Sequence, residues 1–113
     1  MEEVSFNYRG RKISFTAKRV SFFGRAFGLM FSSREKANPL IFEFKEPTKT
    51  PIHSFFVFFP FIAVWLDEKN RVVDVKRIKP FNFSVSPKGY FSKLVEIPIN
   101  KKCSNTMKII SRR

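Results

Sequence analysis

The chain has 113 residues, a mass of 13.3 kDa and a formal net charge of +13. This length predicts one domain spanning residues 1–113, which can bury roughly two-thirds of its unfolded surface without crosslinks. Hydrophobic residues make up 43% of the sequence, a share that excludes wholesale disorder.

Cysteine usage and targeting signals narrow the location of the protein. The single cysteine, Cys103, excludes an internal disulfide and a cysteine-rich zinc site, and it favours a reducing compartment. Residues 1–5 lack the basic and apolar regions of a signal peptide. The most apolar stretch, residues 55–66, is shorter than the ~20 residues of a membrane-spanning helix and contains Pro60. We therefore expect a cytoplasmic protein with no transmembrane segment.

The first part of the chain predicts a hairpin, a short helix and a strand. Apolar and polar residues alternate over residues 4–8 and 12–18, on either side of a turn at Gly10. Apolar residues then recur at helical spacing over residues 21–30, which predicts one short helix. Residues 40–44 predict the next strand, which the charged residues and the proline that follow should end.

The second part of the chain predicts further strands. Apart from His53 and Ser54, residues 52–59 and 61–66 are apolar without alternation, which indicates strands that are covered on both faces near the centre of the fold. Residues 67–70 predict a hairpin loop. Other strands are predicted over residues 71–78, 90–99 and 106–111.

Together, these elements predict a mainly β fold. Many short strands and one short helix are typical of a single antiparallel β-sandwich or small barrel with jelly-roll-like character. No crossover helices separate the strands, so a parallel α/β sheet is not expected.

Several segments in the middle of the chain resemble a conserved uncharacterised family, domain of unknown function 192, and in particular its archaeal branch. The resemblance covers about residues 20–100. It rests on residues 28–31 (GLMF), 40–44 (LIFEF), 52–53 (IH), 55–60 (FFVFFP), 65–67 (WLD), 71–73 (RVV) and 95–98 (VEIP), in this order. It implies a compact, mostly β domain of sandwich or jelly-roll character and no known reaction. The chain departs from the family at Ile62, where the family has an aspartate.

Candidate catalytic groups are few. His53 is the only histidine, and no spacing places Cys103 beside it, so we interpret His53 as a half-buried strand residue with one hydrogen bond. Glu43 and Glu96 lie in predicted strands, where a structural ion pair with Arg25 is favoured over a catalytic acid. The sequence therefore predicts no catalytic residue, no metal site and no cofactor.

The positive charge is concentrated in three segments that contain no acidic residue, residues 4–34, 75–95 and 101–113. Such segments with interleaved aromatic residues favour an anionic partner, either nucleic acid or an acidic protein. A host that favours Lys and Phe codons would produce the same composition without a binding role. The candidate binding residues are Arg9, Arg11, Lys12, Lys18, Arg25, His53, Lys76, Lys101 and Lys102.

Two functional hypotheses follow. The first is a non-enzymatic binding domain whose basic surface engages an anionic partner. For this hypothesis, two or three exposed phenylalanines would form a stacking platform, although most of the 16 Phe are expected in the core. The second is a domain that binds a small ligand or a protein in a pocket near His53 and the turn at Phe31.

Overall fold

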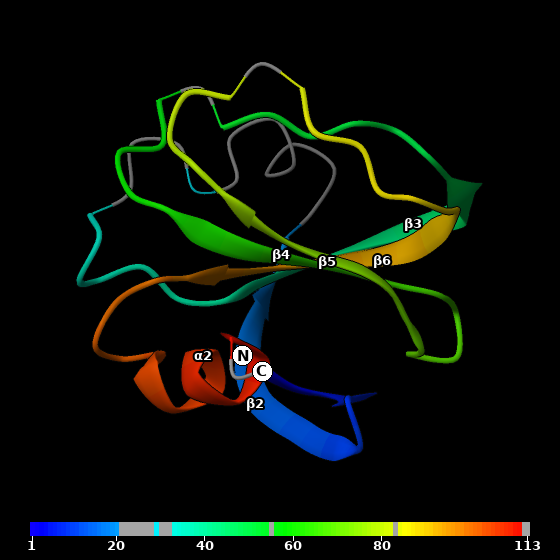
Figure 1. Cartoon of the computed structure of the whole chain (residues 1–113), viewed down its shortest axis with the longest axis horizontal. Coiled ribbons are helices and arrows are strands. Elements are labelled where there is room, and N and C mark those ends of the chain that lie inside the picture. The colour runs from blue at the N-terminus through cyan, green and yellow to red at the C-terminus, as the bar shows by residue number, and fades with distance from the viewer. Residues whose placement is uncertain (21–28, 30–32, 55, 83, 112–113) are drawn as a thin grey trace.

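The computed structural model describes residues 1–20, 29, 33–54, 56–82 and 84–111. Six strands form one sheet in the order β1-β2-β3-β6-β4-β5, with a short helix near the C-terminus (Figure 1). The elements are β1 (Glu2–Tyr8), β2 (Arg11–Arg19), β3 (Leu40–Thr48), β4 (Phe61–Leu66), β5 (Val72–Ile78), β6 (Phe91–Pro98) and α2 (Ser104–Ser111). The predicted mainly β fold is therefore confirmed.

The sheet curls into a half-barrel. The β1–β2 hairpin folds beneath the other four strands, and an isolated bridge between Asn7 and Arg71 joins the two ends of the strand order. The pairs are antiparallel except for β2 and β3, which pair in parallel at Lys18 with Leu40 and at Arg19 with Ile41. This short parallel contact is an exception within a predominantly antiparallel sheet, and the 20 residues between β2 and β3 connect the two strands. The sheet is therefore not a parallel α/β sheet, in agreement with the sequence.

The hairpin turn follows from its two central residues. Arg9 and Gly10 have φ angles of 52° and 79°, and a two-residue hairpin turn of the favoured hand needs positive φ at both positions. Glycine adopts this conformation without steric cost, which explains Gly10. In β2, Ile13 and Ala17 are buried while Lys12 and Lys18 are exposed, as the alternation predicts.

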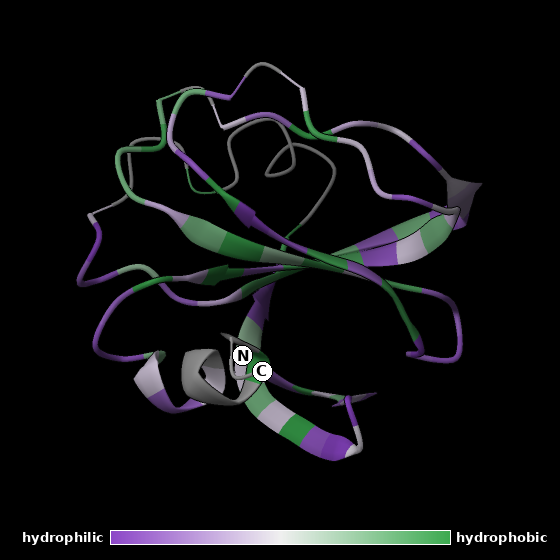
Figure 2. Cartoon of the chain, viewed as in Figure 1, coloured by the Kyte–Doolittle hydropathy of each residue, from purple (hydrophilic) through white to green (hydrophobic). Residues whose placement is uncertain are grey.

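The sheet separates two hydrophobic cores. The lower core lies between the sheet, the hairpin and α2, and contains Val64, Val95 and Cys103. The upper core is covered by long loops and contains Phe59, Trp65 and Phe91. Every residue of β4 is buried, because both cores contact it, as its continuous apolar run predicts (Figure 2).

Two predicted strands are absent. Residues 52–54 and 56–59 form a loop over the upper core, and among these described residues only Ile52 forms a bridge, with Val85. Residues 106–111 belong to helix α2, because Cys103 and Ile110, seven residues apart, both point into the lower core. The helix predicted over residues 21–30 lies outside the described residues, except for Leu29, which is buried.

Strand β3 extends further than predicted. It continues through Pro47 to Thr48, with a register shift against β6 between Glu43 and Thr48. A proline lacks the N–H that a ladder needs, so it fits this irregular part of the strand.

Candidate functional site

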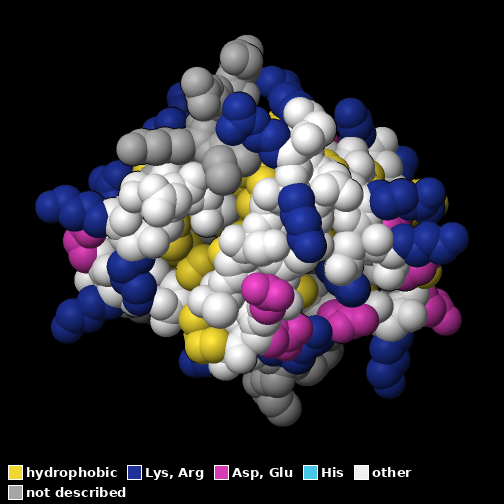
Figure 3. Space-filling model, turned by 90° about the horizontal axis from the view of Figure 1, so that it is seen from below, with side chains coloured by type: hydrophobic (Ala, Val, Ile, Leu, Met, Phe, Trp, Pro, Cys, Tyr) yellow, Lys and Arg dark blue, Asp and Glu magenta, His cyan; other side chains and the backbone are white. Residues whose placement is uncertain are grey.

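The predicted basic residues do not form one patch. Arg9, Arg11 and Lys12 lie at the β1–β2 turn, and Lys18 lies at the opposite end of β2. The guanidinium of Arg9 lies 5.2 Å from the centre of the Tyr8 ring. On the face that the hairpin and α2 form, Lys and Arg side chains are spread out and a group of acidic side chains interrupts them (Figure 3).

The other predicted binding residues are dispersed as well. Lys76 Nζ donates to the carbonyl oxygen of Ser86 at 2.6 Å and lies 3.9 Å from the Asp74 carboxylate. Lys101 and Lys102 are exposed before α2, and Lys102 donates to the side chain of Asn38. Arg25 lies outside the described residues.

His53 differs from its interpretation. It is exposed, and it lies in the loop between β3 and β4 rather than in a strand. Cys103 lies in the lower core, on the other side of the sheet, and burial raises the pKa of its thiol. Within the described ranges, no three His, Cys, Asp or Glu side chains lie close enough to hold a metal ion.

The two strand glutamates have different environments. Arg19 donates to Glu43 at 2.7 Å and to Glu2 at 2.6 Å, and its side chain hydrogen bond holds the pKa of Glu2 below its usual value. Glu96 is only 7% exposed and, among the described residues, has no cation within ion-pairing distance. Burial raises the pKa of Glu96 to about 8, so the side chain is largely protonated at neutral pH.

Three phenylalanines form an exposed aromatic cluster on the loops above the sheet. Phe56, Phe58 and Phe81 are 47%, 62% and 45% exposed. The Phe81 ring centre lies 6.2 Å from that of Phe56 and 5.4 Å from that of Phe58, with interplanar angles of 73° and 75°. These T-shaped contacts hold the three rings together without stacking their faces on one another.

A buried serine positions the two loops that carry the aromatic cluster. Ser54 Oγ donates to the carbonyl oxygen of Lys79 at 2.6 Å and accepts from the backbone N–H of Asn82 at 2.6 Å. The backbone N–H of Phe81 donates to the carbonyl oxygen of Ser54 at 2.9 Å. Because these bonds are buried or partly buried, they fix one loop against the other.

The backbone of the cluster is strained. Phe56 and Phe81 have φ angles of 56° and 60°, a region that bulky residues rarely adopt. Each such residue costs on the order of 1 kcal/mol or more and persists only when its surroundings determine it. Strain combined with exposed apolar rings makes the aromatic cluster the strongest candidate for a functional site.

Comparison with known sequences identifies the family. A UPF0127 protein of the archaeon Pyrococcus horikoshii is 35% identical to the chain over 78 residues, which cover 69% of the chain and 67% of that protein. The chain belongs to the uncharacterised family UPF0127. No family model matches the chain.

Solved structures share the fold of this UPF0127 protein. A protein of unknown function from Novosphingobium aromaticivorans covers 92% of the chain, with a TM-score of 0.73 and 15% identity, and 76% of its own chain is covered. A proposed transcription regulator of Sinorhizobium meliloti covers 96% of the chain, with a TM-score of 0.76 and 16% identity, and 84% of its own chain is covered. In the described part of the chain, no helix has the length and apolar character to cross a membrane.

Sequence reasoning missed the aromatic cluster of this UPF0127 chain. Phe56 and Phe58 are exposed while Val57 and Phe59 are buried, yet all four belong to one apolar run. Hydropathy therefore carries no signal that separates them. Two polar residues, His53 and Ser54, precede the run, and the role of Ser54 depends on residues 79–82 far along the chain.

Proposed function

We propose that this UPF0127 chain is a non-enzymatic binding domain for single-stranded nucleic acid, with the aromatic cluster as the surface on which bases stack. The observation that carries the proposal is the group of three exposed rings on two hydrogen-bonded loops, in which Phe81 contacts both Phe56 and Phe58. Stacking on aromatic side chains contributes about 1–3 kcal/mol per base and tolerates any sequence, because every base has a π-face.

The electrostatics favour the same class of partner. The net charge of +13 attracts a phosphate backbone and promotes fast association. Two exposed cations, Arg77 and Lys79, lie within four residues of Phe81 in the chain. The other candidate cations are dispersed, so they contribute to the overall field rather than to a single groove. The Sinorhizobium meliloti neighbour, as a proposed transcription regulator, is consistent with this partner, although 16% identity concerns the fold alone.

We also propose that the chain's resemblance to domain of unknown function 192 reflects membership, and that the whole chain is one cytoplasmic domain. A direct alignment of UPF0127 sequences with members of that family tests the first point. Microscopy of the tagged protein tests its location, and limited proteolysis tests for a single protected unit.

Fluorescence anisotropy with labelled single-stranded DNA and RNA oligomers tests the proposed function. We expect binding that weakens steeply as the salt concentration rises. Phe58→Ala should lower the affinity about tenfold, because it removes one stacking ring. Tyr90→Ala is the matched control, since Tyr90 is 64% exposed but lies against Lys49 rather than in the cluster.

Two outcomes would overturn the proposal. One is the absence of oligomer binding at low salt. The other is an equal loss of affinity in the Phe58 and Tyr90 variants, which would show that the aromatic cluster has no specific role in binding. Titration with polyglutamate tests the acidic-protein alternative, and tighter binding to polyglutamate than to the oligomers would favour an acidic protein as the partner.

A further inference from the structure

A cavity of about 310 Å³ lies beside the parallel contact between β2 and β3. The backbone N–H of Lys18 donates to the carbonyl oxygen of Pro39 at 2.8 Å and brings the end of β2 against the start of β3. The cavity is lined by Lys18, Leu29, Ser33, Lys36, Ala37, Asn38 and Leu40. It shares no residue with the aromatic cluster, and its volume is at the lower end of the range for small-molecule sites.

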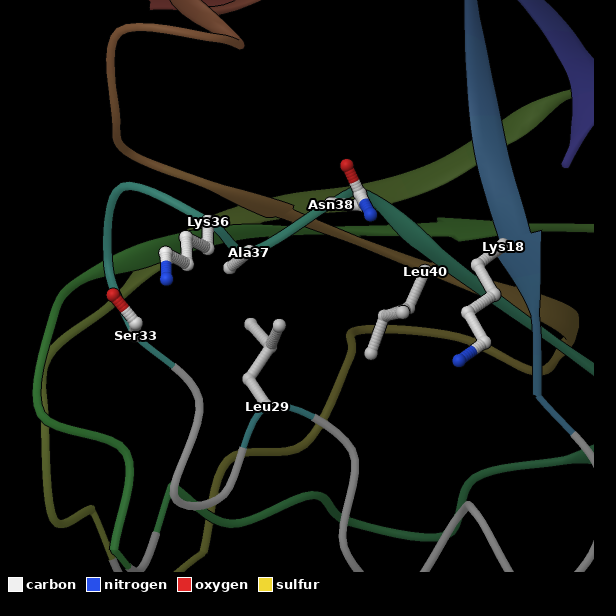
Figure 4. Close-up of a pocket in the computed structure, with 7 residues that line it drawn as sticks. All are labelled: Lys18, Leu29, Ser33, Lys36, Ala37, Asn38 and Leu40. Atoms are coloured by element: carbon white, nitrogen blue, oxygen red, sulfur yellow. The ribbon is translucent and has the colours of Figure 1, made fainter.

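The lining divides into an apolar floor and two polar ends. Leu29, Ala37 and Leu40 converge in the middle of the cavity (Figure 4). Lys36 and Ser33 lie on one side of this floor, and the ammonium group of Lys18 lies on the other side. The two ammonium groups are therefore separated by apolar surface rather than placed around a single point.

The polar groups at both ends are hydrogen-bond donors. Within the described ranges, no carboxylate pairs with Lys18 or Lys36. The side chain oxygen of Asn38 accepts a hydrogen bond from Lys102, which adds a third positive charge at the rim. The amide of an asparagine also carries two N–H donors. Two ammonium groups, an amide and a hydroxyl match anionic oxygens and not a cation.

The loop that carries Lys36 is fixed before any ligand arrives. The buried side chain of Asn100 donates to the carbonyl oxygens of Arg34 at 2.6 Å and Ala37 at 3.0 Å. Arg34 Nε donates to the carbonyl oxygen of Ile99 at 2.8 Å. Such bracing lowers the ordering cost of binding.

We propose that this cavity binds a small organic dianion whose two anionic groups lie at the ends of a short apolar chain. One anionic group of the ligand contacts Lys18, and the other contacts Lys36 and Ser33. The apolar chain between them lies on Leu29, Ala37 and Leu40. A ligand with one anionic group reaches only one of the two ends, so the spacing of the charges sets the specificity.

Isothermal titration calorimetry on the full chain tests this proposal with glutarate, adipate and suberate, and with hexanoate as a singly charged probe. We expect the best dicarboxylate to bind about fivefold more tightly than hexanoate, which is the contribution of one exposed ion pair. Alkane bisphosphonates of the same chain lengths show whether carboxylate or phosphonate is the preferred end group, and preference for either supports a dianion site.

Charge-removing variants provide the controls. Lys18→Gln and Lys36→Gln should each weaken binding of the best dicarboxylate until its affinity equals the affinity of the parent protein for hexanoate. Lys12→Gln removes the same charge from an exposed position on the same face of β2, and it should leave the affinity unchanged. The proposal is overturned if no probe binds up to about 10 mM, which corresponds to a negligible affinity. It is also overturned if dicarboxylates bind no better than hexanoate, or if Lys12→Gln weakens binding as much as Lys18→Gln.

Discussion

Ser54 and Asn82 join the two loops that carry the aromatic cluster through a reciprocal pair of hydrogen bonds. The backbone N–H of Ser54 donates to the carbonyl oxygen of Asn82 at 2.9 Å, and the backbone N–H of Asn82 donates to the hydroxyl of Ser54 at 2.6 Å. The serine side chain is fully buried, so water cannot replace these bonds.

Ser54→Ala should therefore destabilise the protein. The backbone N–H of Asn82 would lose its partner, at a cost of about 1–3 kcal/mol, and the carbonyl oxygen of Lys79 would keep only the 3.4 Å hydrogen bond from Asn82 Nδ2. Urea unfolding measures the decrease in the free energy of unfolding. Amide hydrogen exchange should be faster at Phe81 and Asn82 in the variant. Ser14→Ala, at an exposed position of β2, is the control. A Ser54→Ala variant as stable as the parent would contradict the bracing role.

Substitutions of Phe81 should reverse the usual order of alanine and glycine. At its φ of 60°, glycine is unstrained and alanine is not, so Phe81→Gly should be more stable than Phe81→Ala by about 1 kcal/mol. At Phe58, where φ is not positive, the alanine variant should be the more stable of the two. Urea unfolding of the four variants gives the order of their stabilities. If alanine is more stable than glycine at both positions, or less stable at both, the backbone at Phe81 is not strained.

Glu96 should make the stability of the protein depend on pH. Burial raises its pKa to about 8, above the ~4.3 of an unfolded glutamate. The folded chain keeps a proton that the unfolded chain has already lost, so the free energy of unfolding falls as the pH rises from about 4 to about 8. Above that range, both states are ionised and the fall ends.

Glu96→Gln removes this titration. The variant should match the parent within about 1 kcal/mol at pH 5 and be more stable by several kcal/mol at pH 9. Urea unfolding at pH 5, 7 and 9 measures the difference, with Glu68→Gln as an exposed control. Parallel pH curves for parent and Glu96→Gln would show that the carboxyl group does not titrate in this range.

Asn100→Asp should loosen the loop that carries Lys36. The substitution replaces an amide that donates to two carbonyl oxygens with an oxygen that repels them, which should cost about 3 kcal/mol. Hydrogen exchange should be faster at the amides of Lys36 and Ala37, which both donate to the carbonyl oxygen of Ser33. Unchanged exchange at these two amides would contradict the anchoring role of Asn100.

The sequence predicts the elements whose signals are local. Alternation and a glycine turn predict the β1–β2 hairpin, and the polar loop 67–70 predicts the connection from β4 to β5. The apolar run over residues 52–59 was predicted as a strand but its described residues form a loop, because an apolar loop above a core has the same hydropathy as a buried strand. The segment over residues 106–111 was too short for its helical period to be apparent, and the seven-residue spacing emerges only when Cys103 is included.

The candidate sites depend on contacts between distant segments, which sequence patterns do not contain. Lys18 reaches the cavity because β2 pairs in parallel with β3, and no pattern in the sequence predicts which strands are neighbours. Phe81 reaches Phe56 and Phe58 through hydrogen bonds that Ser54 makes 25 and 28 residues along the chain. Composition predicted a basic chain, whereas the position of each charge followed only from the fold.

The partial pairing of β3 affects how the protein behaves at high concentration. Strand β2 pairs with β3 only at Leu40 and Ile41, so in the described part of the chain the rest of β3 borders no strand on that side. An open strand of this kind can recruit a second molecule and extend into an aggregate. Lys45, Glu46 and Pro47 lie on that stretch, and two charges with a residue that lacks an N–H hinder such recruitment. The short pairing that creates the cavity is thus accompanied by a built-in barrier to fibre growth.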